Sequence, residues 1–273
     1  MDRYELAFGG VRRLYGVAGQ ARLRRAHVCV IGVGGVGSWA VEALARSGVG
    51  ALTLVDMDDI CVSNTNRQLH ALEGEIHKAK VESLAARVRA INPECRVHPV
   101  RAFFVAANAR ELLAPRFDFV FDAMDAVREK ALCLALCREL GVPVITSGGA
   151  GGRRDPARVR VEDLARVTHD RLLQSLRKTL RAEHGFPRGE KKFGIEAVCS
   201  AEPPVFPQSD GRVCATREAG ADLRLDCRSG FGTATFVTGT FGFVAAARIV
   251  ERLAAGPEQE SPRHEKSHRA SVV

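Results

Sequence analysis

The chain has 273 residues, of which 46% are hydrophobic and 26% are charged. This composition excludes a disordered tail protein and a polytopic membrane protein, and it supplies enough apolar material for one large or two modest domains. The formal net charge of +8 favours an anionic partner, although an ordinary solvated surface accounts for the same value.

The first half of the chain alternates strand and helix patterns. Helices are expected between the predicted strands, the clearest of them over Lys80–Ile91, where apolar residues recur on one face. The alternation predicts an α/β fold with a doubly wound, mostly parallel Rossmann-like sheet and helices on both faces. The five segments predicted as strands are His27–Ile31, Ala51–Val55, Arg96–Val100, Phe117–Phe121 and Val142–Thr146.

The pattern changes in the second half, which we interpret as a C-terminal extension of extra strands and helices. A short strand is predicted over Val159–Val161, a basic amphipathic stretch over Asp163–Glu183, and a loop region rich in Gly, Pro and Ser over 186–211. Ser229–Ala247 carries no charge, but its glycines and threonines favour a buried helix at a subunit interface over a membrane span. Residues 257–273 are predicted to form a polar tail.

The excess positive charge is concentrated in residues 151–192. This segment holds twelve Lys and Arg against six Asp and Glu, so it carries +6 of the net charge of +8. Such clustering suits contact with the phosphates of a nucleic acid. An exposed helix with i,i+4 ion pairs explains the charge equally well.

The eight cysteines are interpreted as reduced. No two of them have the Cys-x-x-Cys spacing of a zinc site, and a chain with this much core material does not need a disulfide framework. The first ten residues lack the apolar run of a signal peptide. We therefore expect a cytoplasmic protein without a structural zinc ion.

A glycine-rich turn follows the first predicted strand and opens a helix. It allows the backbone to approach a phosphate closely, and the helix N-terminus presents N–H donors. Asp56 closes the second strand, where a carboxylate can hold a ribose hydroxyl. These features indicate a nucleotide site, and a nicotinamide dehydrogenase fits them equally well. The four glycines of the turn are Gly32, Gly34, Gly35 and Gly37.

Polar residues farther along separate these two options. Arg67 and Lys80 bring two cations toward one site, as nucleotidyl transfer requires because charge builds on the α-phosphate and the departing pyrophosphate. Asp122 and Asp125 follow a strand at the edge where such sheets bind ligands, which suits a magnesium ion on the phosphates. Asp125 also precedes a helix, so N-capping is the alternative.

Together these motifs resemble the ubiquitin-activating-enzyme-like adenylyltransferases, a superfamily that includes the activators of molybdopterin and thiamine sulfur carriers. Further motifs at 146–152, 207–211 and 229–232 extend the resemblance nearly to Leu253 and are similar to the branch that dehydrates threonylcarbamoyladenosine in tRNA. The lack of zinc-binding cysteine pairs agrees with that branch. Ala126 stands where the wider family commonly has asparagine. The shared motifs are Gly-x-Gly-Gly-x-Gly at 32–37, Asp-x-Asp at 56–58, Ser-Asn-x-x-Arg-Gln at 63–68, Lys80 and Asp-x-x-Asp at 122–125.

The resemblance implies a two-step reaction on a modified adenosine beside the anticodon of tRNA. The substrate carboxylate attacks the α-phosphate of ATP and releases pyrophosphate, and the ureido nitrogen then closes onto the acyl-adenylate and expels AMP. The alternative is adenylation of the C-terminus of a small ubiquitin-like sulfur carrier. In both cases the resemblance implies a single adenylation domain over 1–256, with a nucleotide-binding core at 14–152 and a basic substrate-binding extension at 153–256.

The resemblance also assigns roles by position. Arg67, Lys80 and Asp125 are expected to be catalytic, with Asp125 as the metal ligand. Arg13 would reach the ATP of a partner subunit across a homodimer interface, or it is only a surface charge. Cys199 lies where relatives use a thioester cysteine, although a buried thiol is the simpler interpretation. The expected nucleotide contacts are Gly32, Gly34, Gly35, Gly37, Asp56, Asp58, Asn64, Asn66, Arg67, Gln68, Lys80, Asp122 and Asp125.

The implied cofactors are ATP and Mg²⁺, together with a monovalent cation. The implied partners are tRNA carrying threonylcarbamoyladenosine, a second copy of the chain and a sulfur-acceptor protein associated with a cysteine desulfurase. Contact with a membrane is not expected.

Overall fold

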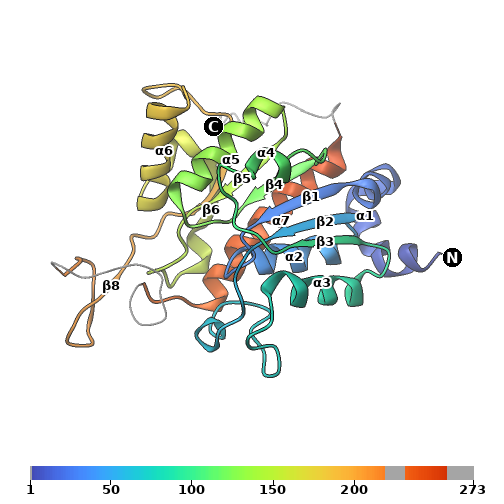
Figure 1. The fold of residues 1–273 in the computed structure, drawn as a ribbon, viewed down its shortest axis with the longest axis horizontal. Helices are drawn as coiled ribbons and strands as arrows, with labels where there is room; N and C mark the ends of the chain where they lie inside the picture. The colour runs from blue at the N-terminus through green and yellow to red at the C-terminus, as the bar shows by residue number, and fades with distance from the viewer. Residues whose placement is uncertain (1, 219–230, 257–273) are drawn as a thin grey trace, which may run out of the picture.

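The computed structural model describes residues 2–218 and 231–256. Its centre is a seven-stranded sheet with the strand order β3-β2-β1-β4-β5-β7-β6 (Figure 1). Neighbouring strands are parallel except β6, which is antiparallel to β7. The mostly parallel Rossmann-like sheet predicted from the sequence is confirmed. The strands are β1 (His27–Ile31), β2 (Ala51–Val55), β3 (Arg96–Val100), β4 (Phe119–Asp122), β5 (Val144–Ser147), β6 (Val159–Asp163) and β7 (Glu196–Ser200).

Helices cover both faces of this sheet (Figure 1). Alternate residues of β1 enter opposite cores: Val28 and Val30 pack with α2, α3 and α7, whereas Cys29 and Ile31 pack with α4 and α5. A strand buried on both faces reads as a continuous apolar run, which is why β1 and β2 are visible in the sequence. The helices are α1 (Arg3–Arg25), α2 (Gly37–Arg46), α3 (Lys80–Ile91), α4 (Ala109–Leu112), α5 (Val127–Leu140), α6 (Arg171–Glu183) and α7 (Thr235–Ala255).

The extension after residue 152 completes this same sheet. Its strand β7 pairs with β5, β6 pairs with β7 at the edge of the sheet, and α6 packs on α5. A separate two-stranded pair, β8 (Phe206–Pro207) with β9 (Val213–Cys214), follows. The sequence did not predict β7, because that short strand lies within the segment rich in Gly, Pro and Ser.

The basic helix begins later than predicted. Asp163 caps a short 3₁₀ turn over Leu164–Arg166, and Asp170 caps α6 itself. α6 therefore starts at Arg171. The Asp163 carboxylate accepts a hydrogen bond from the Ala165 N–H at 2.9 Å and ends β6, whereas Asp170 accepts one from the Leu173 N–H at 3.0 Å. Each bond satisfies a donor that a helix start leaves unpaired.

The uncharged C-terminal segment enters α7 at Thr235, later than predicted, and the helix continues through charged residues to Ala255. α7 lies against α2 (Figure 1). Val237 and Phe241 are buried, whereas Phe236 and Phe243 face outward with 58% and 47% of their surfaces exposed. None of the described helices combines the length and the apolar content that a bilayer crossing requires. Residues 229–230 of the predicted helix and the predicted tail at 257–273 lie outside the described residues.

The close packing of α7 on α2 depends on Gly242. A Cβ atom at Gly242 would lie 2.5 Å from the Val36 carbonyl oxygen and 2.8 Å from the Cβ of Trp39. At Gly239, one turn earlier on α7, the added atom would meet the Trp39 ring at 3.7 Å, an ordinary contact. A Cβ atom therefore fits at Gly239 but not at Gly242.

We expect Gly242→Ala to lower the free energy of unfolding by about 1–3 kcal/mol, because α7 must move away from α2. Gly239→Ala is the matched control, and its stability should stay unchanged or rise by up to about 1 kcal/mol through the higher helix propensity of alanine. Urea denaturation followed by circular dichroism measures both values. Equal destabilisation of the two variants would contradict this packing.

Candidate active site

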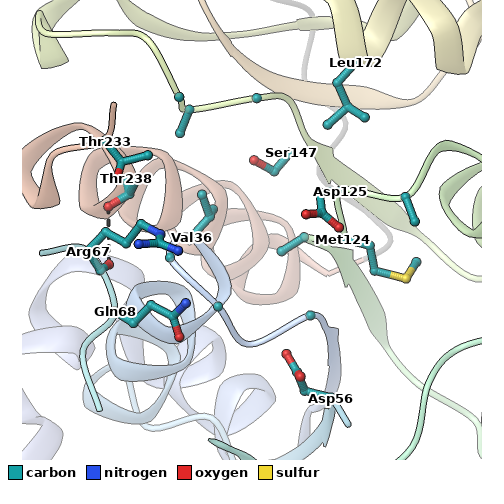
Figure 2. Close-up of a pocket in the computed structure, with 18 of the residues that line it drawn as sticks. Val36, Asp56, Arg67, Gln68, Met124, Asp125, Ser147, Leu172, Thr233 and Thr238 are labelled. Carbon is teal, nitrogen blue, oxygen red and sulfur yellow. Dashed lines mark hydrogen bonds between the residues drawn. The ribbon is translucent and has the colours of Figure 1, made fainter. Parts of the chain in front are cut away.

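A cleft of about 1040 Å³ opens at the carboxyl ends of the parallel strands (Figure 2). The strand order reverses between β1 and β4, and ligands of doubly wound sheets bind at such a switch point. The two strand ends meet there, since a Cβ at Gly32 would lie 2.9 Å from the Ala123 carbonyl group. Ligand pockets typically measure about 300–1,000 Å³, so this cleft has room for a nucleotide and part of a second ligand.

The four glycines of the turn serve two purposes. Gly32 has a φ of +84°, and a Cβ at Gly37 would clash with the Gly32 carbonyl oxygen, so the chain itself requires both. Gly34 and Gly35 line the cleft, and a Cβ there would meet no atom closer than 3.4 Å. Their missing side chains leave open space for a ligand. Gly37 lies behind the turn, outside the lining.

Asp56 connects the glycine-rich turn to the loop after β2. Its Oδ2 accepts a hydrogen bond from the Val33 N–H and its Oδ1 accepts one from the Asp58 N–H, each at 2.9 Å. Figure 2 shows the carboxylate at the edge of the cleft. These bonds fix its orientation and leave further lone pairs for a ribose hydroxyl.

Lys80 places a buried cation at the cleft. Only 6% of its surface is exposed, and its Nζ lies 2.7 Å from Oδ2 of the exposed Asp58. Both side chains line the cleft. A buried ammonium needs a countercharge, which Asp58 supplies.

Arg67 is held by neutral groups. Its Nη1 donates to the Ser63 carbonyl oxygen at 2.8 Å and to Oδ1 of Asn66 at 3.0 Å. Figure 2 shows the guanidinium directed toward the glycine-rich turn near Val36. Asn66 lies outside the lining and donates from Nδ2 to the Thr233 carbonyl oxygen at 3.0 Å, so it positions Arg67 from behind.

Asn64 and Gln68 both line the cleft. Oδ1 of Asn64 accepts a hydrogen bond from the Cys61 N–H at 3.0 Å and closes a 3₁₀ turn over Val62–Asn64. Oε1 of Gln68 is buried and has no hydrogen-bond partner among the described residues. An unpaired buried acceptor is costly, so a hydrogen-bond donor that reached this oxygen would stabilise the site.

Nearby His70 was not singled out by the sequence. It is 3% exposed, and both ring nitrogens lack a hydrogen-bond partner within the described part of the chain. Burial, together with the charge of Lys80, lowers the pKa of His70 to about 4. The ring is therefore neutral at physiological pH and adds no charge beside Lys80.

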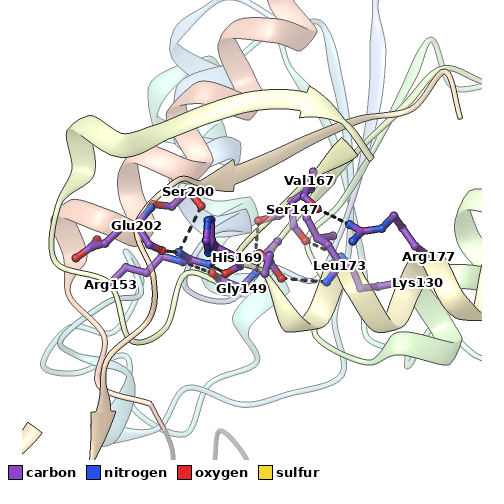
Figure 3. Close-up of polar contacts among 12 residues, drawn as sticks. Lys130, Ser147, Gly149, Arg153, Val167, His169, Leu173, Arg177, Ser200 and Glu202 are labelled. Carbon is purple, nitrogen blue, oxygen red and sulfur yellow. Dashed lines mark hydrogen bonds and ion pairs between the residues drawn. The ribbon is translucent and has the colours of Figure 1, made fainter. Parts of the chain in front are cut away.

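Asp122 differs from the expected metal or nucleotide ligand. It is fully buried, outside the cleft lining, and its Oδ2 lies 2.8 Å from Nζ of Lys130, which is also fully buried. Lys130 also donates to the carbonyl oxygen of Met124 at 3.0 Å. It donates as well to the carbonyl oxygen of Ser147 at 2.9 Å (Figure 3). The pair thus fixes the loops after β4 and β5, which form part of the cleft wall.

Asp125 remains as the exposed carboxylate of this motif. It lines the cleft and makes no hydrogen bond or ion pair with another described residue. N-capping does not occupy it, because α5 has Ala126 as its N-cap residue without a side-chain bond. Figure 2 shows the carboxylate next to Met124, directed into the cleft.

Two residues singled out in the sequence lie elsewhere. Arg13 is exposed on α1 and does not line the cleft of its own chain. Cys199 is fully buried in β7, and burial raises the pKa of its thiol to about 11, which fits a buried thiol rather than a nucleophile. Within the described ranges, no three His, Cys, Asp or Glu side chains form a metal-binding group.

The far wall of the cleft consists of residues to which the sequence assigned no individual role, although most of them lie in the predicted substrate-binding extension at 153–256. They are the loop 148–151, Arg153 and the segment His169–Leu172. The only sequence signal was the glycine-rich motif at 146–152, because the contacts that assemble this wall join segments far apart in the chain.

Known proteins resemble this chain over most of its length. The ThiF family matches residues 10–263. The chain is 48% identical over 256 residues to the tRNA threonylcarbamoyladenosine dehydratase of Escherichia coli (strain K12), covering 93% of this chain and 96% of that protein. The crystal structure of the E. coli tRNA N6-threonylcarbamoyladenosine dehydratase in complex with ATP has a TM-score of 0.85 at 42% identity and covers 96% and 99% of the two chains. Its AMP complex has a TM-score of 0.83 at 44% identity and covers 93% and 97%.

Loss of the Lys130–Asp122 pair should destabilise the fold, because the pair holds the loops after β4 and β5. Lys130→Met leaves the Asp122 carboxylate buried without a countercharge and should lower the free energy of unfolding by about 3–5 kcal/mol. Arg110→Met is the control, because Arg110 and Glu139 form an exposed pair at 2.9 Å whose loss should cost less than about 1 kcal/mol. Denaturant titration compares the two, and a Lys130→Met variant as stable as Arg110→Met would refute the role of the pair.

Proposed function

The chain belongs to the ThiF family, and from this membership and the cleft we infer that it is an ATP-dependent dehydratase of threonylcarbamoyladenosine in tRNA. The observation that carries this conclusion is the 48% identity to the E. coli dehydratase over nearly the full length of both chains. The cleft supports this conclusion, because it places the cations Arg67 and Lys80 beside a glycine-rich turn that leaves room for phosphates.

The first step joins two anions. A carboxylate oxygen of the threonylcarbamoyl group forms a bond to the α-phosphorus of ATP, and the bond to pyrophosphate breaks with its electron pair leaving on pyrophosphate. We propose that Arg67 and Lys80 stabilise the charge that develops on these oxygens. Arg67 can do so without first losing an acidic partner, since its bonds in the protein are to Ser63 and Asn66.

The second step closes a ring. The ureido nitrogen forms a bond to the activated carbonyl carbon, the bond from that carbon to the AMP oxygen breaks, and the nitrogen loses its proton. Because both reacting groups belong to one side chain, ring closure has a high effective molarity. The substrate has then lost one water, whose elements are divided between pyrophosphate and AMP.

We propose that the remaining lining residues bind the nucleotide. Gly34 and Gly35 offer the space for phosphates, whereas Asp56 and the unpaired Oε1 of Gln68 are placed to accept hydrogen bonds from the ribose. Asn64 lines the same part of the cleft. Three expected contacts lie behind the lining and support residues in front of them. Asp122 pairs with Lys130, and Asn66 accepts a hydrogen bond from Arg67. Gly37 leaves room for the Gly32 carbonyl group.

A magnesium ion fits Asp125. The cleft is lined by more carboxylates than cationic side chains, so the protein's own cations cannot balance a triphosphate. Mg²⁺ typically uses one or two carboxylates together with substrate phosphates, and Asp125 offers such a carboxylate. When bound, the ion would neutralise phosphate charge. The monovalent cation stays a prediction.

We propose a homodimer in which Arg13 reaches the ATP of the partner subunit. Arg13 is exposed and lies outside its own cleft, and on the same helix Leu14 and Val17 are 78% and 70% exposed. Exposed apolar side chains of this size suit an interface between subunits. The sulfur-acceptor protein stays a prediction.

We also propose that the basic extension binds the tRNA backbone. Exposed Lys178, Arg188, Lys191 and Lys192 lie on α6 or in the loop after it. Because β6 and β7 belong to the central sheet, we propose that 1–256 form one adenylation domain with its nucleotide core at 14–152. A cytoplasmic location agrees with this substrate.

Release of pyrophosphate from ATP tests the function. We expect release with tRNA that carries threonylcarbamoyladenosine, and none with a small ubiquitin-like sulfur carrier or without a second substrate. The released pyrophosphate is quantified by a coupled phosphatase assay. Release with the sulfur carrier alone would overturn the proposed function.

Arg67→Ala should reduce this release at least about 100-fold, because one fixed cation at the phosphates is lost. Arg116→Ala is the matched control, because Arg116 is an exposed cation outside both the cleft and the basic segment 151–192, and this variant should keep the wild-type rate. Similar rates for both variants would refute the assignment of Arg67.

A further inference from the structure

None of the residues assigned above to adenylation lies in the far wall of the cleft. This wall contains the loop 148–151, Arg153 and the segment His169–Leu172, which leads into α6. Leu172 lies across the cleft from Asp56 and Gln68 (Figure 2). The wall therefore faces the space beyond the nucleotide-binding residues, where the second substrate must enter.

The buried side chain of Arg153 connects the segments of this wall through hydrogen bonds. It is 4% exposed, and its guanidinium donates to the carbonyl oxygens of Gly149 and His169, each at 2.9 Å (Figure 3). It also donates to the Glu202 carbonyl oxygen. One buried side chain thus joins the loop after β5, the segment before α6 and the residues that follow β7.

Asp170 completes the same network. Its Oδ2 accepts a hydrogen bond from the Gly149 N–H at 2.9 Å and lies 3.8 Å from Nη2 of Arg153. Its Oδ1 caps α6 through the Leu173 N–H at 3.0 Å. His169 is therefore fixed on both sides, because its carbonyl is bound to Arg153 and the next residue is the helix cap.

This fixation holds His169 in an unusual backbone conformation. Its φ is +57°, in the left-handed region, which costs about 1–3 kcal/mol for a residue with a side chain. The imidazole is exposed, lines the cleft and makes no hydrogen bond with another described residue. Strain of this kind persists when the surroundings enforce it, and here it presents a proton acceptor to the cleft.

His169 is the single histidine among the described residues that line the cleft. Among the carboxylates there, Asp58 pairs with Lys80, Asp59 pairs with Arg101, and Asp170 binds backbone N–H groups. Asp125 is the proposed magnesium ligand, and Glu129 is a further carboxylate of the lining. Ring closure requires a base, because the ureido nitrogen must lose its proton as it bonds to carbon. Imidazole is the side chain best suited to accept a proton near neutral pH.

We propose that His169 is the general base of ring closure, an inference that rests on the proposed function. A ring nitrogen of His169 takes the proton of the ureido N–H as the nitrogen bonds to the activated carbonyl carbon. The bond from that carbon to the AMP oxygen breaks, and its electron pair leaves with AMP. The imidazolium then returns the proton to solvent.

The test separates the two steps in single turnover with modified tRNA. His169→Asn keeps a residue that tolerates the left-handed conformation but cannot take the proton. We expect AMP release and cyclic product to fall about 100-fold, the contribution typical of a general base, while pyrophosphate release stays within about threefold of the wild type. His77→Asn is the matched control, because His77 is exposed with a φ of +70° outside the cleft, and both steps should be unchanged.

His169→Gly extends the test. Glycine relaxes the backbone and leaves space for a free imidazole, so added imidazole should restore AMP release in this variant but not in His169→Asn. Ring closure at the wild-type rate in His169→Asn, equal loss of both steps, or absence of rescue would each overturn the role of His169. A wild-type protein that releases no pyrophosphate with modified tRNA would instead overturn the proposed function itself.

Discussion

The reaction brings together two anions, the triphosphate of ATP and the carboxylate of the substrate, and their repulsion is the constraint that the site must overcome. Fixed cations do this best where little water screens them. Lys80 is buried and needs Asp58 as its countercharge in the free protein, whereas Arg67 is held by a carbonyl and an amide oxygen. The positive charge of Arg67 is therefore available to a phosphate, and that of Lys80 is shared with an exposed carboxylate.

The fold supplies this arrangement through the ends of its parallel strands. The turn after β1 and the loops after β2, β4 and β5 meet at one edge of the sheet, so residues distant in sequence line one cleft. Two buried networks hold the loops in place. Lys130 with Asp122 joins the ends of β4 and β5, and Arg153 with Asp170 joins the loop after β5 to the start of α6.

Local signals in the sequence located the residues on the side of the cleft formed by the glycine-rich turn and the loop after β2. The strand pattern of the first half predicted β1, β2 and β3 with their observed bounds, and the spacing of the glycines, Arg67 and Lys80 indicated a phosphate site. The sequence could not assign Asp122, because a carboxylate at a strand end looks the same whether it faces a cleft or a buried lysine. The far wall was also hidden, because the task of His169 depends on contacts with Arg153 that only the folded chain creates.

The most direct test of the account is a crystal structure of the protein with magnesium and a non-hydrolysable ATP analogue. We predict that the triphosphate lies along Gly34 and Gly35, with the guanidinium of Arg67 and the ammonium of Lys80 within hydrogen-bond distance of its oxygens. A triphosphate bound outside this cleft, or both cations directed away from it, would contradict the account.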